Sequence, residues 1–319
     1  MKAAATYAWL SAPLLMLAAC AAPALPDAAL PDAARSAPPA TPPATAPDSA
    51  ADRMMTIDGT RLRVRIEGPA EAPPILLIHG YTFSLETWDS WAADLARDHR
   101  VIRYDLSGHG LSDPDPQARY GTADRVRQLK ALMDHLGIAR VTLAGNSFGG
   151  LVAWNFAALY PDRVDRLILI DSAAYSINGV TEKPVPVPPA MRAYLSAPTP
   201  QGVAISAAQI FAHPERLTPQ RLDLMRAMIA RPGNGPALIA HLEQFTLPEP
   251  TAQLGRIAAP TLILWGREDK VVPVDHADRL AAAIPNARRI IYEDTGHAPQ
   301  EEAAGRSLAD VRAFLNDKP

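Results

Sequence analysis

A glycine-rich turn centred on Ser147 constrains the fold of this chain more than any other feature. The turn, Gly145-Asn146-Ser147-Phe148-Gly149-Gly150, follows an apolar run at 140–144 that is typical of a buried strand and precedes a helical pattern at 151–160. A serine that joins a strand directly to a helix takes a strained backbone conformation, and larger neighbours at 145 or 149 would clash. The pattern predicts a nucleophile elbow, with the Ser147 hydroxyl exposed beside the amides of a helix N-terminus.

Strand and helix patterns alternate along the chain from residue 54 onward. We expect strands at 62–66, 74–78, 101–105, 140–144, 166–171, 260–265 and 288–292. We expect helices at 87–97, 122–136, 151–160, 275–284 and 301–315, with Thr122 as the cap of the second helix and Gly137 at its end. This alternation predicts an α/β fold with a doubly wound, mostly parallel sheet.

The interval 172–247 interrupts the alternation. It contains four prolines between 183 and 190, and helices are expected to start at Thr218-Pro219 and at Pro236. We expect a helical cap here, inserted over the C-terminal edge of the sheet between two core segments, 54–171 and 248–319. Six apolar residues of the cap either line a substrate pocket or pack the cap against the core: Leu222, Met225, Met228, Leu238, Leu242 and Phe245.

Residues 1–19 have the character of a signal peptide, too short and too interrupted by Pro13 for a membrane-spanning helix. The segment leads into Leu17-Ala18-Ala19-Cys20, which resembles the lipobox of bacterial lipoproteins, and Cys20 is the only cysteine of the chain. The resemblance implies lipidation of Cys20 and, because Ala21 is not aspartate, a place in the outer membrane of the cell envelope. A plain secretory signal, with Cys20 incidental, is the alternative.

Residues 20–53 are rich in alanine and proline, and this composition favours an extended tether without a core of its own. The chain of 319 residues has a formal net charge of −3, so no basic field indicates nucleic acid as a partner. The sequence shows no cofactor motif and no metal-ligand cluster, and we therefore expect neither.

A serine nucleophile needs a base, and the base needs a carboxylate that orients it. The base candidate is His297, in Asp294-Thr295-Gly296-His297 after the last expected strand. The acid candidate is Asp269, directly after a buried strand, with Glu268 and Asp171 as its competitors. The other histidines are expected to be surface or packing residues (His99, His135, His213, His241 and His276) or structural members of motifs (His79 and His109).

The negative charge that develops on a substrate oxygen needs hydrogen-bond donors. One expected donor is the backbone amide of Phe148, next to the nucleophile. The other is the amide of Tyr81, after the strand that ends in His79-Gly80, where Gly80 allows a tight turn. A simple strand-ending turn is the alternative for His79-Gly80.

Five motifs, in this order, resemble those of the α/β-hydrolase superfamily. They are Ile78-His79-Gly80-Tyr81, the loop 105–112, the elbow, Trp265-Gly266-Arg267-Glu268-Asp269 and Gly296-His297. The resemblance covers about residues 54–319 and implies the catalytic order Ser147, Asp269, His297, with a structural role for the loop. The serine disfavours haloalkane dehalogenases and epoxide hydrolases of this fold, which use aspartate.

The resemblance further implies a carboxylesterase that cleaves small to medium apolar esters through an acyl-enzyme, held at the membrane by its N-terminal lipid. C–C bond hydrolases share an elbow of this kind, but they usually carry a Gly-Pro-Gly-rich run where this chain has Tyr81-Thr82-Phe83-Ser84. Cofactor-free perhydrolases with the same triad remain an alternative. So does a non-catalytic ligand-binding lipoprotein on the same scaffold.

Overall fold

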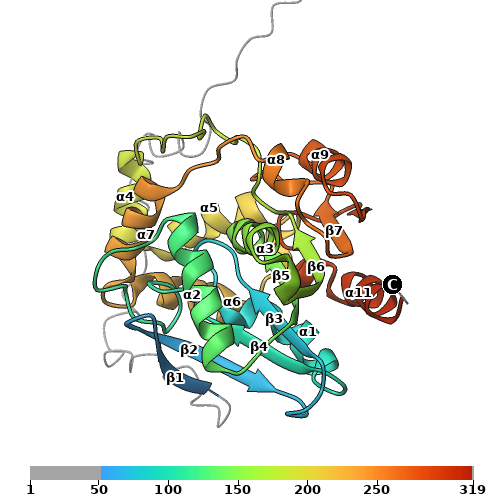
Figure 1. Cartoon of the computed structure of the whole chain (residues 1–319). Coiled ribbons are helices and arrows are strands. Elements are labelled where there is room, and N and C mark those ends of the chain that lie inside the picture. The colour runs from blue at the N-terminus through green and yellow to red at the C-terminus, as the bar shows by residue number, and fades with distance from the viewer. Residues whose placement is uncertain (1–51, 318–319) are drawn as a thin grey trace, which may run out of the picture.

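The computed structural model describes residues 52–317. An eight-stranded sheet in the order β1-β2-β4-β3-β5-β6-β7-β8 runs through it (Figure 1). The strands are β1 (Asp52–Ile57), β2 (Thr60–Glu67), β3 (Pro74–Ile78), β4 (Arg100–Tyr104), β5 (Val141–Asn146), β6 (Val164–Ile170), β7 (Thr261–Gly266) and β8 (Ala287–Tyr292). Strand β2 pairs antiparallel with both β1 and β4, and all the other neighbouring strands pair parallel. The predicted doubly wound, mostly parallel sheet is confirmed.

Helices cover both faces of the sheet. One face packs against α2 (Thr122–His135), α3 (Phe148–Leu159), α8 (Thr251–Leu254) and α9 (Asp275–Ala283). The other face packs against α1 (Asp89–Leu95) and α11 (Ala304–Asn316), with the 3-10 turn η1 (Leu85–Trp88) and α10 (Pro299–Glu302) beside them.

Strand β3 shows why these segments have continuous apolar sequences. Leu76 and Ile78 lie in the core under α2 and α3, whereas Ile75 and Leu77 lie in the core under α1 and α11. Because successive side chains of a strand point to opposite faces, a strand covered on both sides must be apolar at every position.

Four further helices lie between β6 and β7: α4 (Pro189–Ser196), α5 (Pro200–Ile210), α6 (Pro219–Ala230) and α7 (Asn234–Gln244). The short 3-10 turn η3 (Pro214–Arg216) separates α5 from α6. The Thr218 hydroxyl accepts a hydrogen bond of 3.1 Å from the Arg221 amide, so the predicted helix start at Thr218-Pro219 is confirmed. Met225 is buried with Phe83 and Phe211, and it therefore packs these helices against the core.

Several boundaries differ from the sequence predictions, and three of the differences have an evident local reason. Strand β1 begins at Asp52, inside the expected tether, because the Asp52 carboxylate accepts hydrogen bonds from Arg63 and Arg65 of β2. Thr122 is the first residue of α2 and does not cap it; Gly121 takes the cap position without a side-chain hydrogen bond. The expected closing helix is divided into α10 and α11, because the backbone at Ala303 is not helical.

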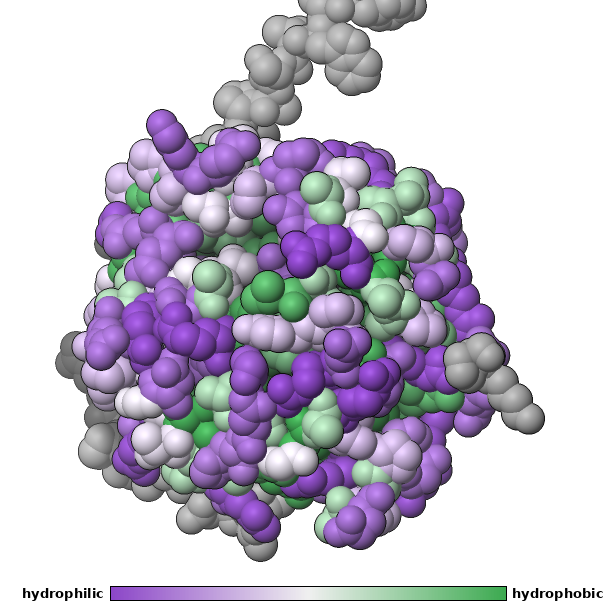
Figure 2. Space-filling model, in the orientation of Figure 1, coloured by the Kyte–Doolittle hydropathy of each residue, from purple (hydrophilic) through white to green (hydrophobic). Residues whose placement is uncertain are grey.

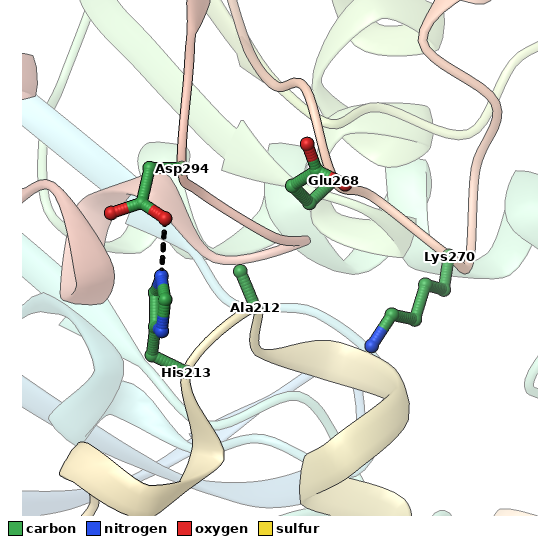
Figure 3. A pocket seen from close by; sticks show the side chains of 5 residues that line it. All are labelled: Ala212, His213, Glu268, Lys270 and Asp294. Carbon is green, nitrogen blue, oxygen red and sulfur yellow. Dashed lines mark hydrogen bonds and ion pairs between the residues drawn. The ribbon is translucent and has the colours of Figure 1, made fainter.

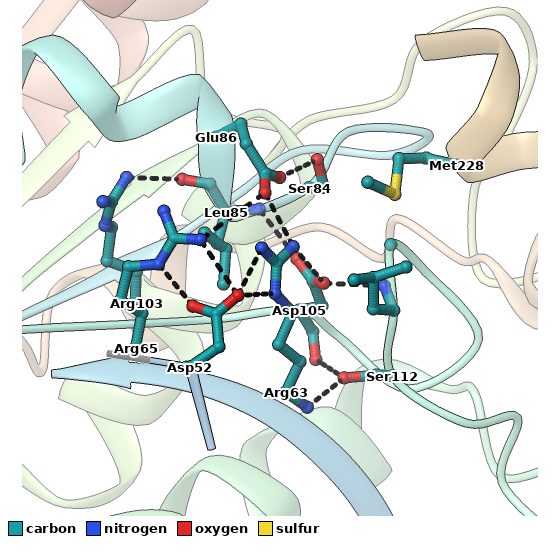
Figure 4. A network of polar contacts seen from close by, with 12 residues as sticks. Asp52, Arg63, Arg65, Ser84, Leu85, Glu86, Arg103, Asp105, Ser112 and Met228 are labelled. Carbon is teal, nitrogen blue, oxygen red and sulfur yellow. Dashed lines mark hydrogen bonds and ion pairs between the residues drawn. The ribbon is translucent and has the colours of Figure 1, made fainter. Parts of the chain in front are cut away.

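A buried ion network ties the β1–β2–β4 side of the sheet to η1 (Figure 4). The guanidinium of Arg63, which is 1% exposed, lies 2.7 Å from both Asp52 and Glu86. The fully buried Asp105 accepts a 2.7 Å hydrogen bond from the Leu85 amide. Burial, and then the charge of Glu86, raises the pKa of Asp105 to about 6. The network thereby fixes the segment that follows β3.

The surface seen in Figure 2 mixes hydrophilic and hydrophobic residues. Among residues 52–317, the exposed large apolar side chains are Met54, Leu159 and Val185. Within residues 52–317, no helix has both the length and the apolar character that crossing a membrane requires.

Candidate active site

Ser147 stands at the sharp turn between β5 and α3. Its backbone dihedrals are φ 55° and ψ −117°, a conformation that a non-glycine residue adopts only under strain. The Ser147 amide donates to the carbonyl of Ile170 at 2.9 Å, and its carbonyl accepts from Leu151 and Ala173, each at 3.1 Å. These bonds tie the strained residue to α3, to the end of β6 and to the loop that follows β6, as an elbow requires.

Glycines around the elbow allow the backbones to come close together. A Cβ atom on Gly149 would lie 2.2 Å from the Ile78 carbonyl oxygen, and one on Gly145 would lie 2.2 Å from the Gly149 carbonyl oxygen. A Cβ atom on Gly80 would lie 3.2 Å from the Cβ of Ser147. The loop after β3 therefore runs directly beside the serine.

His297 and Asp269 form a hydrogen-bonded pair. The distance from His297 Nδ1 to Asp269 Oδ2 is 2.7 Å, and both side chains are buried. The other carboxylate oxygen of Asp269 accepts from the amides of Val271 at 2.7 Å and Val272 at 3.0 Å. Because the carboxylate accepts from Nδ1, Nε2 is left free to act as a base.

The serine and histidine segments are joined through Asn146. Its Nδ2 donates to the backbone carbonyl of His297 at 3.0 Å and to that of Ile170 at 3.2 Å. The amide of His297 donates to the Ile210 carbonyl at the end of α5, at 2.7 Å. Three elements that are far apart in the sequence thus converge on one place at the carboxyl ends of the strands, where this class of sheet binds ligands.

Asp171 lies beside this pair and is fully buried. Its Oδ1 accepts a 2.9 Å hydrogen bond from the Gly266 amide, while its Oδ2 has no protein partner. Asp171 therefore belongs to a cluster with Asp269 and His297. A carboxylate oxygen of each aspartate and a ring nitrogen of the histidine lie within 4.8 Å of one another. Burial, and then the charge of Asp269, raises the pKa of Asp171 well above its usual range, which favours the protonated form of Asp171. A neutral carboxyl is a poor ligand for a metal ion, because a carboxylate ligand must be ionised.

Glu268, the other competitor for the acid, points elsewhere. It lines a hollow of ≈ 370 Å³ together with Ala212, His213, Lys270 and Asp294 (Figure 3). Glu268 is exposed at this surface, whereas the Asp269 side chain is buried against His297.

The expected oxyanion donors lie next to this arrangement. Phe148 is the first residue of α3, so its amide has no partner four residues earlier in the helix. His79 fixes the other loop: its Nδ1 donates to the Gly80 carbonyl at 2.8 Å and its Nε2 accepts from the Leu106 amide at 3.0 Å. Burial lowers the pKa of His79 to about 4, which keeps the ring neutral in this structural role. The amide of Tyr81 as a donor stays a prediction.

Two of the histidines that were expected to be surface or packing residues are notable. His213 is bonded to Asp294 and Glu215 at the surface. His241 of α7 is buried. The centroid of its ring lies 4.2 Å from the ring centroid of Phe148 and 4.9 Å from that of Tyr81. His241 is thus a packing residue, as expected, but nothing local in the sequence marks its proximity to the elbow.

The chain belongs to the α/β-hydrolase family, whose family model matches residues 73–304. The protein is therefore a hydrolase of the α/β-hydrolase fold. A 2-hydroxy-6-oxononadienedioate/2-hydroxy-6-oxononatrienedioate hydrolase of Klebsiella pneumoniae is 30% identical over 283 residues, which cover 83% of this chain and 96% of that protein.

Two solved structures are similar over 83% of this chain. A membrane phospholipase A, described as a bacterial virulence factor, has a TM-score of 0.73 and 27% identity over 85% of its own chain. A meta-cleavage product hydrolase variant has a TM-score of 0.74 and 25% identity over 98% of its own chain.

Proposed function

We propose that the protein is a serine hydrolase that cleaves carboxylic esters of small to medium substrates through an acyl-enzyme. Ser147 attacks the carbonyl carbon, His297 takes the hydroxyl proton, and Asp269 orients the imidazole. The amides of Phe148 and Tyr81 stabilise the oxyanion, and His297 returns the proton to the leaving alcohol. Water, activated by the same histidine, then releases the acid.

One observation carries this proposal. The strained Ser147 backbone and the 2.7 Å His297–Asp269 hydrogen bond are joined by the bond from Asn146 Nδ2 to the His297 carbonyl. Strain is retained at a site only when the surroundings enforce it, and here the enforced residue is a potential nucleophile beside an oriented base. A non-catalytic ligand-binding protein would have no need of this arrangement.

A second candidate is the hydrolysis of a C–C bond, because the Klebsiella relative and the meta-cleavage product hydrolase structure are both similar to this chain. The elbow, with its Asn146, also favours this candidate. The segment Tyr81-Thr82-Phe83-Ser84 favours the ester, because the Tyr81 hydroxyl is bonded to the Leu238 carbonyl of α7 and fills the loop that is glycine-rich in C–C hydrolases. Turnover of p-nitrophenyl butyrate against that of a dienoate meta-cleavage product distinguishes the two.

The test of the mechanism is Ser147→Ala in the full chain. A fluorophosphonate probe labels the wild type, and the variant loses both labelling and ester turnover, because only the nucleophilic oxygen is removed. Asn155→Ala, on the same helix, is the matched control and keeps both. Retention of most of the activity in Ser147→Ala contradicts the assignment of the nucleophile.

We further propose that Cys20 carries a lipid that holds the enzyme at the membrane of the cell envelope. Cys20 and the segment 1–51 lie outside the described residues, so this proposal rests on the lipobox-like sequence alone. Mass spectrometry of the mature N-terminus tests it: a diacylglyceryl adduct on Cys20 is expected, and an unmodified Cys20 overturns it.

A further inference from the structure

Helix α2 carries a buried arginine, Arg125, that forms no ion pair with any of residues 52–317. Its side chain is 1% exposed, and its guanidinium donates to the hydroxyl and, at 3.0 Å, to the carbonyl of Ser107. The guanidinium carbon lies 5.1 Å from the ring centroid of Tyr120, and the buried Nε has no partner in this range. Burial lowers the pKa of Arg125 to about 10, so the group is still charged at neutral pH.

The acids that act on Arg125 do not neutralise its charge. Asp115 and Asp124 influence it through space and without a hydrogen bond. Asp115 is paired instead with Arg119 at 2.8 Å. Asp124 is paired with Arg127 at 2.9 Å. A neutral glutamine could donate to the same loop without the cost of burying an unpaired charge, so hydrogen bonding alone does not account for an arginine here.

The charge of Arg125 reaches the side of the site where the two oxyanion amides are expected. Burial is the first cause of the lowered pKa of His241, and the charge of Arg125 is the second. The ring centroid of His241 lies 4.2 Å from that of Phe148. Burial also lowers the pKa of His79 most, and the charge of Arg125 adds to it. Because His79 stands two residues before Tyr81, the positive charge acts on a neighbour of each expected donor.

We propose that Arg125 stabilises the oxyanion through its charge, without contact with the substrate. Attack by Ser147 moves negative charge onto the substrate oxygen, beside the amides of Phe148 and Tyr81. A fixed positive charge in a buried, weakly screened place favours this state over the uncharged ester. The effect is therefore on the transition state and not on the binding of a neutral substrate. The inference rests on the proposed function.

The test compares two substitutions of Arg125 that separate its charge from its hydrogen bonds. Arg125→Gln keeps a donor and loses the charge, whereas Arg125→Lys keeps the charge. With p-nitrophenyl butyrate, Arg125→Gln is expected to lower kcat roughly 10-fold while KM stays within about 2-fold, as expected of one charge that acts without direct contact. Arg125→Lys should keep most of kcat. Equal losses of kcat in both variants, or a change confined to KM, overturn the proposal.

A boronic acid provides a readout that a merely structural role would not move. With butylboronic acid, the Ser147 oxygen adds to boron, its proton passes to His297, and the boron centre takes the negative charge. The free inhibitor is neutral and the adduct at boron is anionic, so Ki should rise roughly 10-fold in Arg125→Gln and stay near the wild-type value in Arg125→Lys. An unchanged Ki in Arg125→Gln contradicts the proposal.

The control for the loss of an arginine is Arg312→Met. Arg312 lies on α11 and is paired with Asp94 and Asp98, on the face of the sheet that α1 and α11 cover. This variant should keep the wild-type kcat, KM and Ki, and a rise in Ki equal to that of Arg125→Gln overturns the proposal. Circular dichroism and Tm establish that each variant is folded. Where Arg125→Gln does not fold, Arg125→Met replaces it in the same comparisons.

Labelling of Ser147 by the fluorophosphonate probe separates this proposal from the proposed function. An unlabelled wild type contradicts the serine mechanism itself. A labelled wild type whose Arg125→Gln variant retains the wild-type kcat contradicts only the role of Arg125.

Discussion

At the scale of single residues, the carboxyl pair Asp171–Asp269 is the most unusual feature of the candidate site. Two carboxylates this close in a buried place cannot both be ionised. Asp269 accepts hydrogen bonds from two backbone amides and from His297, whereas Asp171 accepts a hydrogen bond from one backbone amide. The surroundings therefore supply Asp269 with three hydrogen-bond donors and Asp171 with one, and the raised pKa of Asp171 favours its neutral form.

Substitution of each carboxyl by its amide tests this division of roles. Asp269→Asn should lower kcat on the order of 10³–10⁴, because the imidazole loses the partner that sets its tautomer. Asp171→Asn should cost far less, because the amide side chain is neutral and can still accept from the Gly266 amide. The measurement is kcat on p-nitrophenyl butyrate, and the reverse ranking would make Asp171 the catalytic acid.

At the scale of elements, the inserted helices are attached to the catalytic loops by polar contacts. Lys270 donates to the Ala208 carbonyl at 3.1 Å, and Glu302 accepts from the amides of both His213 and Gly296. At the surface, His213 bonds to Asp294 in the loop that carries His297 (Figure 3). The end of α5 and the two catalytic loops therefore form one connected unit.

This attachment predicts a pH-dependent stability. Asp294, and then Glu215, raise the pKa of His213 above 6.5, so its contribution is complete below about 6.5 and is lost as the pH rises through the raised value. The Tm of wild type should therefore exceed that of His213→Gln most below pH 6, and the difference should shrink above that range. His135→Gln, at an exposed position, is the control. A constant difference from pH 5 to 9 contradicts the contribution of His213.

The sequence predicted most elements because their signals are local. The strands β3 and β7 are marked by apolar runs, and the elbow by its glycines. Strand β1 escaped prediction because its place depends on Asp52 meeting arginines of β2, which composition does not reveal. The proximity of His241 to the elbow could not be predicted for a similar reason: it depends on where α7 lies over Phe148, which is set by tertiary packing.

At the scale of the whole molecule, Asp52 at the start of β1 is bound to the sheet by charged hydrogen bonds from Arg63 and Arg65 of β2. Burial would raise the pKa of Asp52, but hydrogen bonds from Arg65 and Arg63 outweigh it and lower the pKa. The stabilisation is therefore present above pH 3.8 and is lost as the pH falls through the lowered value. The ion network of Figure 4 thus stabilises the sheet at neutral pH.

Replacement of Asp52 by asparagine should lower the free energy of unfolding at pH 7 by about 1–3 kcal/mol, because two buried or half-buried guanidinium groups lose a charged acceptor. Urea unfolding at pH 7 and at pH 3 measures this, and the difference from wild type should be smaller at pH 3. Asp165→Asn, whose partner Arg140 is exposed, is the control with little effect. An equal loss at both pH values contradicts the assignment.

In the part of the chain that the structure describes, the open sheet ends at β8, whose one paired neighbour is β7. An unpaired strand edge invites the strands of other molecules, and natural proteins commonly guard it with charge. Here the exposed positions of β8 carry Arg288 and Arg289, which are themselves paired with Asp317 and Asp278. A second copy could add its strand only by displacing these ion pairs and bringing like charges together, so the edge of β8 resists aggregation.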